Sequence, residues 1–420
     1  MSEKAVQRTS FESEGGGRSI PFRVQKAMPT LFFIWLLVTV LGPHKMMYRV
    51  VFHAVLIPAL LIVLCSGYRR LIQLDPFLKL FLAFIAYTSL STFLVGTDLI
   101  SLDVEIFRWG IEAAFGLLVF WLCMPAIVSS PLLWARLFLL LAFLGSLGGF
   151  LFGPSRMAGL GVLYNPVQAA SILMVYFAMG HFLLVQGETR WRWSDLVLVL
   201  VSFTAVAAFV FLSRSRGPIL TFVIYALFLL PLSSGRRHLW TALGVVGIAV
   251  LISALTIELT VGLEGFLERL IARGGSHRLE IWKGYLMHPP ESLLLGYGAG
   301  TPPEQMKAAE LFWKPNGYIV THAHNLWIGT FAESGLIGLG FLLAIFGFLA
   351  WNSVWTGRDW TDRFGLLTLL ALVIMLTMTG EHTLVVSLKP IWIFGWLPLL
   401  LVWFWSRYGP GRERELPNGY

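Results

Sequence analysis

The sequence predicts an all-α polytopic integral membrane protein. Of its 420 residues, 57% are hydrophobic and only 13% are charged, whereas a soluble domain typically carries about 25% charged residues. The apolar residues gather in runs of about 20, the length that an α-helix needs to cross the hydrocarbon core of a bilayer. We expect about 12 transmembrane helices and one large outward-facing loop that contains short helices.

The apolar runs give the candidate transmembrane helices, some of them short enough to need support from their neighbours. The expected helices are residues 28–43, 49–67, 76–95, 107–129, 132–152, 166–186, 194–213, 217–233, 239–261, 324–350, 364–380 and 390–406.

The charged loops set the direction of threading, because Lys and Arg concentrate on the cytoplasmic side. With the N-terminus inside, each inward turn contains at least one arginine: Arg69 and Arg70, Arg136, Arg190 and Arg192, Arg236 and Arg237, Arg358 and Arg363. The chain then has five parts: a disordered cytoplasmic tail at 1–27, transmembrane helices within 28–261, an outward loop at 262–323, further transmembrane helices within 324–406, and a second cytoplasmic tail at 407–420.

The net charge of +8, from 31 basic and 23 acidic residues, does not indicate a nucleic-acid partner. The basic excess follows from the positive-inside rule and from contact with anionic membrane lipids. Cys65 and Cys123 both lie in apolar segments, so we expect neither a disulfide framework nor a cysteine metal site.

Arg156, Arg214, Arg216 and Arg278 all fall on the outward side of this threading. An arginine at bilayer depth costs at least about 2.5–3.5 kcal/mol on insertion scales, so it usually has a partner or a function. Together with His322 and His324, these arginines indicate a basic pocket for a phosphate-bearing substrate.

Arg214 and Arg216 lie in a short turn between two apolar helices, just before Gly217 and Pro218. Proline favours the first turn of a helix, and a helix N-terminus attracts phosphate. The two guanidiniums would add a permanently charged clamp. The alternative is that both arginines extend to lipid headgroups.

The outward loop contains a segment with helical spacing, in which Leu279, Trp282 and Leu286 would lie along the membrane surface. Arg278, Trp282 and Tyr285 could share one face of this helix, where a cation and aromatic rings would suit a sugar diphosphate. The alternative is an interfacial anchor with an incidental arginine.

The sequence Gly296-Tyr297-Gly298 has no βαβ context, so a dinucleotide site is rejected. A tight turn that brings backbone close to the pocket is one interpretation, and a plain linker is the other.

His322 and His324 precede an apolar helix that Asn325 can cap. Histidine has an ordinary pKa near 6.5 and can act as a neutral base, although a lone histidine is often only a packed interfacial residue. The sequence offers no obvious third metal ligand, so we expect no metal. Glu333, within the apolar helix, is expected to form a salt bridge with one of the arginines.

These elements in this order resemble the O-antigen ligase family of bacterial envelope glycosyltransferases. The resemblance covers about residues 205–345. It rests on Ser215-Arg216-Gly217, Arg278 with Trp282, Gly296-Tyr297-Gly298, His324-Asn325-Leu326 and Glu333-Ser334-Gly335. Arg156 with Asn165-Pro166 resembles an upstream outer element of the same family.

The resemblance implies an O-antigen ligase, a metal-independent inverting glycosyltransferase without a cofactor. Its donor would be a glycan linked to undecaprenyl pyrophosphate, and its acceptor a sugar hydroxyl of lipid A–core oligosaccharide. The chain would lie in the bacterial inner membrane with its active site periplasmic, and could have partners in O-antigen assembly.

The resemblance also implies roles for residues. Arg216 and Arg278 would hold the leaving pyrophosphate, and His324 would be the general base. We expect further substrate contacts from Arg214, Arg156, Trp282, Tyr297, His322, Asn325 and Glu333.

Three other functions stay open. An O-antigen polymerase or another O-oligosaccharyltransferase would use similar chemistry on a different acceptor. An organic-anion transporter would place its charges near the bilayer midplane, whereas here they gather at the outer edge.

Overall fold

A computed structural model describes residues 20–44, 46–65, 75–95, 100–152, 160–187, 192–232, 277–357, 359–380 and 383–410, with isolated positions between 244 and 264. Within these ranges the chain forms helices and no strand, which confirms the all-α class. Arg156 and nearly all of the segment 239–261 lie outside the described residues.

Nine helical stretches of the described chain are long and apolar enough to cross a membrane. They are α1 (Ile20–Leu41), the continuous α2 (Met47–Val51), η2 (Phe52–Leu56) and α3 (Ile57–Cys65), α4 (Pro76–Val95), α5 (Ile100–Ser129), α6 (Pro131–Phe152), α7 (Pro166–Gly187), α8 (Trp193–Leu212), α13 (Leu326–Thr356) and α14 (Trp360–Gly380). Two shorter apolar segments complete the set: α9 (Arg216–Leu232), and η7 (Trp392–Trp396) with α15 (Leu397–Tyr408).

Every expected span except 239–261 coincides with a helix, and α4 has the expected bounds. The helix α1 begins at Ile20 rather than at residue 28, because Val24 and Met28 pack into the core and extend the helix by two turns. The helix α5 begins at Ile100 rather than at 107, which brings Glu105 and its neighbours into regular helix.

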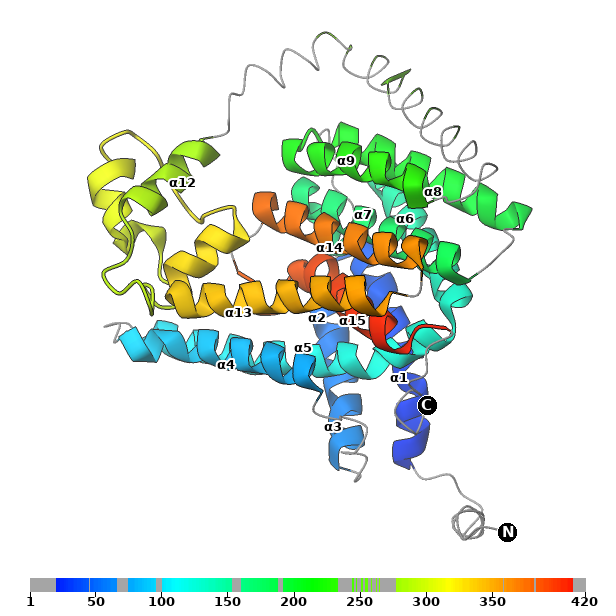
Figure 1. Ribbon diagram of the computed structural model, residues 1–420, viewed down its shortest axis with the longest axis horizontal. Coiled ribbons are helices and arrows are strands. Elements are labelled where there is room, and N and C mark those ends of the chain that lie inside the picture. The colour runs from blue at the N-terminus through cyan, green and yellow to red at the C-terminus, as the bar shows by residue number, and fades with distance from the viewer. Residues whose placement is uncertain are drawn as a thin grey trace.

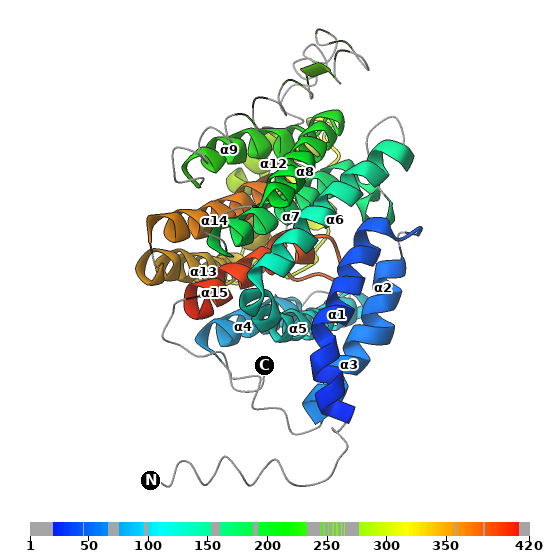
Figure 2. The ribbon, with the colours of Figure 1, turned by 90° about the vertical axis from the view of Figure 1, so that its right-hand side faces the viewer.

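The core is built around α7, because 89% of an 18-residue apolar stretch of this helix is buried. A helix that is apolar all round must be enclosed by others, and α7 packs against α6, α8, α9 and α14. The segment η7–α15 is likewise enclosed, and its Trp392, Trp396, Trp403 and Trp405 are almost fully buried. Figure 2 shows α1 beside α3, at the edge of this core.

Residues 277–323, the described part of the expected outward loop, form a small folded unit at one end of the molecule, on the left in Figure 1. It contains α12 (Arg278–Met287) and two short turns, η5 (Pro303–Gln305) and η6 (Ala309–Trp313). Its own core includes Ile281, Tyr285 and Trp313. The expected short helix is therefore present, with Leu279 and Leu286 exposed at 66% and 64%.

The long helix α13 is broken at Gly335, which adopts a backbone φ of 62° and ψ of −163°. The carbonyls freed by the break have partners from other segments: Ala332 O accepts the Tyr297 N–H at 2.8 Å, and Ser334 O accepts the Tyr87 hydroxyl at 2.9 Å. Satisfied carbonyls allow such a break at membrane depth. The break ties the outward loop to the membrane helices.

Candidate active site

The first basic group of the site is Arg216, the first residue of α9. The turn before it is held by hydrogen bonds from Ser213 N to Phe209 O (2.8 Å) and from the Ser215 N–H to Ser213 Oγ (3.3 Å). Gly217 permits close packing, since a Cβ there would lie 2.5 Å from Thr379 Oγ1 at the end of α14. The start of α9 is thereby fixed against α14, and Arg216 with it.

The second basic group is Arg278, the first residue of α12. The helix is anchored by Ile281 and Tyr285, which are buried on one face, and Tyr285 contacts Trp313 edge-on with ring centroids 4.7 Å apart. Burial and the charge of Arg216 both lower the pKa of Arg278. Two guanidiniums from distant segments therefore act on each other, which raises the positive potential of the site.

The two histidines lie just before α13, with ring centroids 3.8 Å apart. Thr321 Oγ1 is 3.0 Å from His322 Nδ1. Asn325 caps α13 as expected: its side-chain oxygen accepts hydrogen bonds from the N–H groups of Trp327 (2.9 Å) and Ile328 (3.2 Å). Trp282 holds the backbone between the histidines, because its indole N–H donates to Ala323 O at 2.9 Å.

The electrostatics of the histidines link them to the arginines. Burial, then His322 and Arg278, lower the pKa of His324 from 6.5 to about 4. Burial, then Lys389 and Arg278, lower the pKa of His322. Both histidines are therefore neutral at physiological pH, and each has a lone pair able to accept a proton.

Backbone strain marks the same residues. In the described part of the chain, three residues other than glycine have positive φ: Arg214 (51°), His277 (56°) and His324 (51°). One is His324 itself, and the others lie within two residues of Arg216 and Arg278. Such conformations cost of order 1–3 kcal/mol and cluster at functional sites. This observation is independent of the charges and indicates the same site.

A cavity of about 290 Å³, the first cavity, opens beside the histidines. Its walls include His322, Tyr285, Glu333 and Lys389. The buried Glu333 accepts a hydrogen bond from the Gly300 N–H and lies in the field of Lys389. An arginine was the expected partner of Glu333, and that pairing stays a prediction. Lys389, whose field acts on Glu333, was not singled out from the sequence, although it stands at the outward start of the expected span 390–406.

Tyr297 and Arg214, which were also expected to contact substrate, have structural surroundings of their own. The hydroxyl of Tyr297 accepts the Lys307 N–H at 3.1 Å and is 3.4 Å from Pro289 O, so it organises the outward loop. Gly296 lies in a tight turn, with a φ of 80° and a position at which a Cβ would lie 2.6 Å from Gly335 N. That this turn brings backbone close to the pocket stays a prediction. Arg214 lies in the turn that precedes α9, and its Nε is buried.

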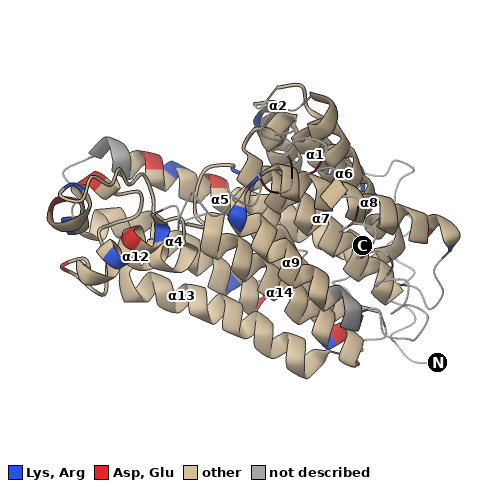
Figure 3. Cartoon of the chain, turned by 90° about the horizontal axis from the view of Figure 1, so that it is seen from above, with Lys and Arg blue, Asp and Glu red and all other residues tan. Residues whose placement is uncertain are grey.

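Charged residues concentrate around α12 and α5, whereas the long helix α13 carries a single charged residue, Glu333 (Figure 3). In the described segments, no group of three or more His, Cys, Asp or Glu side chains is arranged to hold a metal ion. The site is therefore an arrangement of cations and neutral bases, suited to an anionic substrate that gains negative charge during reaction.

Comparison with known proteins identifies the same stretch of sequence. Residues 199–343 match the family described as O-antigen ligase, a range that contains α9, α12, both histidines and the break in α13. A protein of Pseudomonas aeruginosa named O-antigen ligase is 26% identical over 271 residues, which are 62% of this chain and 61% of the relative. The match thus spans less than two thirds of that relative's length. Both matches are thus to proteins described as O-antigen ligases, and the family match includes the segment that carries Arg216, Arg278 and the two histidines.

Proposed function

We propose that this protein transfers a polysaccharide from an undecaprenyl-pyrophosphate donor to a sugar hydroxyl of lipid A–core oligosaccharide, at the periplasmic face of the inner membrane. The observation that carries the proposal is the electrostatic coupling of Arg278 to Arg216 and to both histidines. The family match supports glycosyl transfer, and the coupled cations supply what a diphosphate leaving group needs.

In this mechanism Arg216 and Arg278 bind the donor's diphosphate. The bond between the anomeric carbon and the diphosphate oxygen breaks as the acceptor oxygen bonds to that carbon from the opposite face, so the configuration inverts. The departing diphosphate takes the bonding electrons. Guanidiniums already in place stabilise the charge as it develops, without reorganisation. Because the arginines neutralise the diphosphate, the proposed reaction needs no metal.

His324 accepts the proton of the acceptor hydroxyl. A base with a pKa near 4 is neutral but weak, so binding of the donor must strengthen it. The diphosphate would neutralise the field of Arg278, which is one of the charges that lower the pKa of His324. The donor would therefore raise the basicity of His324 as it binds, and a positioned base contributes about 10²–10⁴-fold to such a reaction.

The test is a lipopolysaccharide gel and an assay of lipid-linked glycan in a bacterial strain that lacks this gene, with and without a plasmid-borne copy. We expect the O-antigen bands to disappear, with long glycan accumulating on the lipid carrier, and the copy to restore both. A core capped by a single repeat would indicate a polymerase instead. An unchanged ladder would overturn the proposal and favour another acceptor or transport.

Variants test the residue roles in the same strain. His324→Ala and Arg278→Ala should abolish transfer while the protein still inserts into the membrane. The matched control is Lys307→Gln, an exposed cation of the same loop that pairs with Glu291 at 3.0 Å. Normal transfer by a folded His324→Ala protein would exclude His324 as the base.

A further inference from the structure

A second cavity, of about 470 Å³, lies between η2 and the first turns of α5. Its lining combines two arginines, two glutamates and a histidine with apolar side chains. Its lining includes Arg49, His53, Ile57, Glu105, Arg108, Trp109, Glu112 and Phe115. Its volume lies in the range typical of small-molecule sites, about 300–1,000 Å³.

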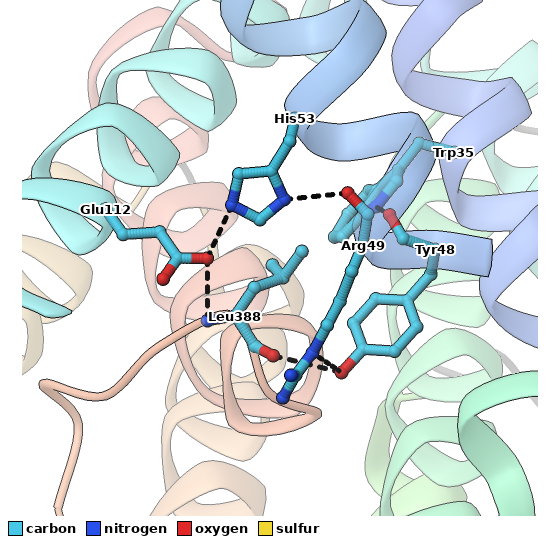
Figure 4. A network of polar contacts seen from close by, with 6 residues as sticks. All are labelled: Trp35, Tyr48, Arg49, His53, Glu112 and Leu388. Atoms are coloured by element: carbon cyan, nitrogen blue, oxygen red, sulfur yellow. Dashed lines mark hydrogen bonds and ion pairs between the residues drawn. The ribbon is translucent and has the colours of Figure 1, made fainter. Parts of the chain in front are cut away.

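A polar network builds one wall of this cavity (Figure 4). His53 Nε2 is 2.9 Å from Glu112 Oε1, and the same oxygen accepts the Leu388 N–H at 3.2 Å. His53 Nδ1 is 2.8 Å from Arg49 O. A carbonyl oxygen can only accept, so Nδ1 carries a proton, and a further proton must lie between Nε2 and Oε1. The network joins η2, α5 and the segment before η7 into one fixed wall.

The same network orients Arg49. The hydroxyl of Tyr48 donates to Leu388 O at 3.0 Å and accepts from Arg49 Nε at 3.2 Å. Arg108 pairs only loosely, at 3.7 Å, with Glu105, and their side chains are 71% and 48% exposed. Such an exposed pair contributes little, so a ligand anion can compete for Arg108.

The lining has the chemistry of a glycolipid site. Guanidiniums such as Arg49 and Arg108 bind phosphate or carboxylate through two parallel hydrogen bonds. Carboxylates such as Glu105 accept hydrogen bonds from sugar hydroxyls, and an indole ring offers an apolar face to a sugar. Ile57 and Phe115, in the same lining, would contact a hydrocarbon chain. The combination of charged and apolar side chains in one cavity matches an anionic sugar on a lipid anchor.

The two cavities share a wall. Trp109 lines both of them, and Lys389 Nζ, from the first cavity, lies 5.7 Å from the centroid of the Trp109 ring. A molecule in the second cavity is therefore a neighbour of His322 and Glu333, which line the first.

We propose that the second cavity binds the acceptor glycolipid through a phosphate-bearing sugar held by Arg49 and Arg108, while the donor occupies the arginine–histidine site. This assignment rests on the proposed function, since it names the place of the second substrate. It gives the protein two anion sites, one for the leaving group and one that recognises the acceptor.

Binding tests the proposal without requiring transfer. The probe is lipid A–core bearing phosphate on its sugars, added to the full chain in nanodiscs of zwitterionic lipid. Arg49→Ala and Arg108→Ala should each weaken binding about tenfold, the loss expected for one charge-assisted hydrogen bond. Lys307→Gln should leave binding unchanged. The dephosphorylated probe should bind wild-type protein about tenfold more weakly and be indifferent to both arginine variants.

Two outcomes would overturn the assignment. The first is unchanged binding of the phosphorylated probe by the Arg49→Ala/Arg108→Ala double variant. The second is displacement of the probe by phosphatidylglycerol at equal concentration, which would show a general site for lipid headgroups. Arg108→Gln serves as a second variant, because so exposed a side chain can be replaced without unfolding the chain.

A His324→Ala background separates this proposal from the proposed function. The acceptor should still bind to this variant although transfer is lost. If the wild-type protein also binds acceptor but shows no transfer, the proposed reaction is refuted and the cavity assignment stands. In active protein, Arg108→Gln should raise the KM for acceptor about tenfold and leave the KM for donor unchanged. Transfer with an unaltered acceptor KM would refute the cavity alone.

Discussion

Gly296 and Gly335 meet backbone to backbone: a Cβ on Gly296 would lie 2.6 Å from the nitrogen of Gly335. Around this contact, the Leu336 N–H donates to Leu293 O at 2.8 Å and the Tyr297 N–H donates to Ala332 O at 2.8 Å. The loop that carries Gly296 therefore packs against the break in α13, and the break fixes the position of Glu333 relative to the histidines.

Replacing Gly335 by alanine should destabilise the protein and disorganise the site. Its backbone conformation is almost exclusive to glycine and costs about 1–3 kcal/mol for other residues, and a Cβ would also collide with Leu294 O. We expect a lower melting temperature in detergent together with loss of transfer. The control is Gly340→Ala on the same helix, where a Cβ meets nothing within 4 Å; it should be neutral or stabilising. Equal stability of the two variants would contradict the role assigned to the break.

Trp282→Phe separates two roles for this ring. A phenyl ring could still stack on a sugar but cannot donate to Ala323 O, the bond that holds the peptide between the histidines. Loss of one such bond costs about 0.5–1.5 kcal/mol. We expect kcat to fall severalfold with little change in the donor KM, measured by steady-state transfer. A donor KM that rises at constant kcat would instead support stacking on the substrate. Trp355→Phe, at an exposed position of α13, is the control.

The sequence predicted the helices well because long apolar runs and charged turns leave few alternatives. It also placed Arg216 and Arg278, which are far apart in the chain, on the same side of the threading. The structure brings them within electrostatic reach, and their roles stay predictions. The cap formed by Asn325 followed from local chemistry alone.

The residues that were missed share one cause. Arg49, Arg108 and Lys389 stand at outward ends of expected spans, where ordinary interfacial charges also occur, so their position in the sequence does not mark them. They differ from ordinary interfacial charges because distant segments pack together around them. Trp109, for example, lines both cavities. No spacing within a single segment carries that information. The position of the break at Gly335 was also missed, because an apolar run has the same composition whether or not its helix is broken.

Removal of the cap should loosen the histidine segment. Asn325→Ala deletes the acceptor for the N–H groups of Trp327 and Ile328, at a cost of about 1 kcal/mol. Thermal unfolding in detergent should show the loss, with a parallel fall in transfer because His324 is the preceding residue. Asn325→Asp retains an acceptor oxygen and should preserve stability. If alanine and aspartate were equally stable, the cap would not be what fixes this end of α13.

The protonation of His324 should depend on Arg278. Its pKa is lowered from 6.5 to about 4, so folding favours the neutral ring. Between about pH 4 and pH 6.5 the unfolded chain therefore binds more protons than the folded chain. The stability that the neutral His324 contributes is fully present above pH 6.5 and is lost as the pH falls toward 4. Diethylpyrocarbonate, which modifies neutral imidazole, should label His324 down to about pH 4 in the wild-type protein, with the site read by mass spectrometry.

Arg278→Gln removes one cause of the low pKa, so the labelling midpoint should move upward toward 6.5, and Lys307→Gln should leave it in place. Saturating donor should move the wild-type midpoint in the same direction, since the diphosphate neutralises the same guanidinium. If neither the substitution nor the donor moves the midpoint, burial and His322 set the pKa of His324 without Arg278. His324 would then stay too weak a base when the substrate is bound, and the proposed proton transfer would need another acceptor, for which the adjacent His322 is the nearest candidate.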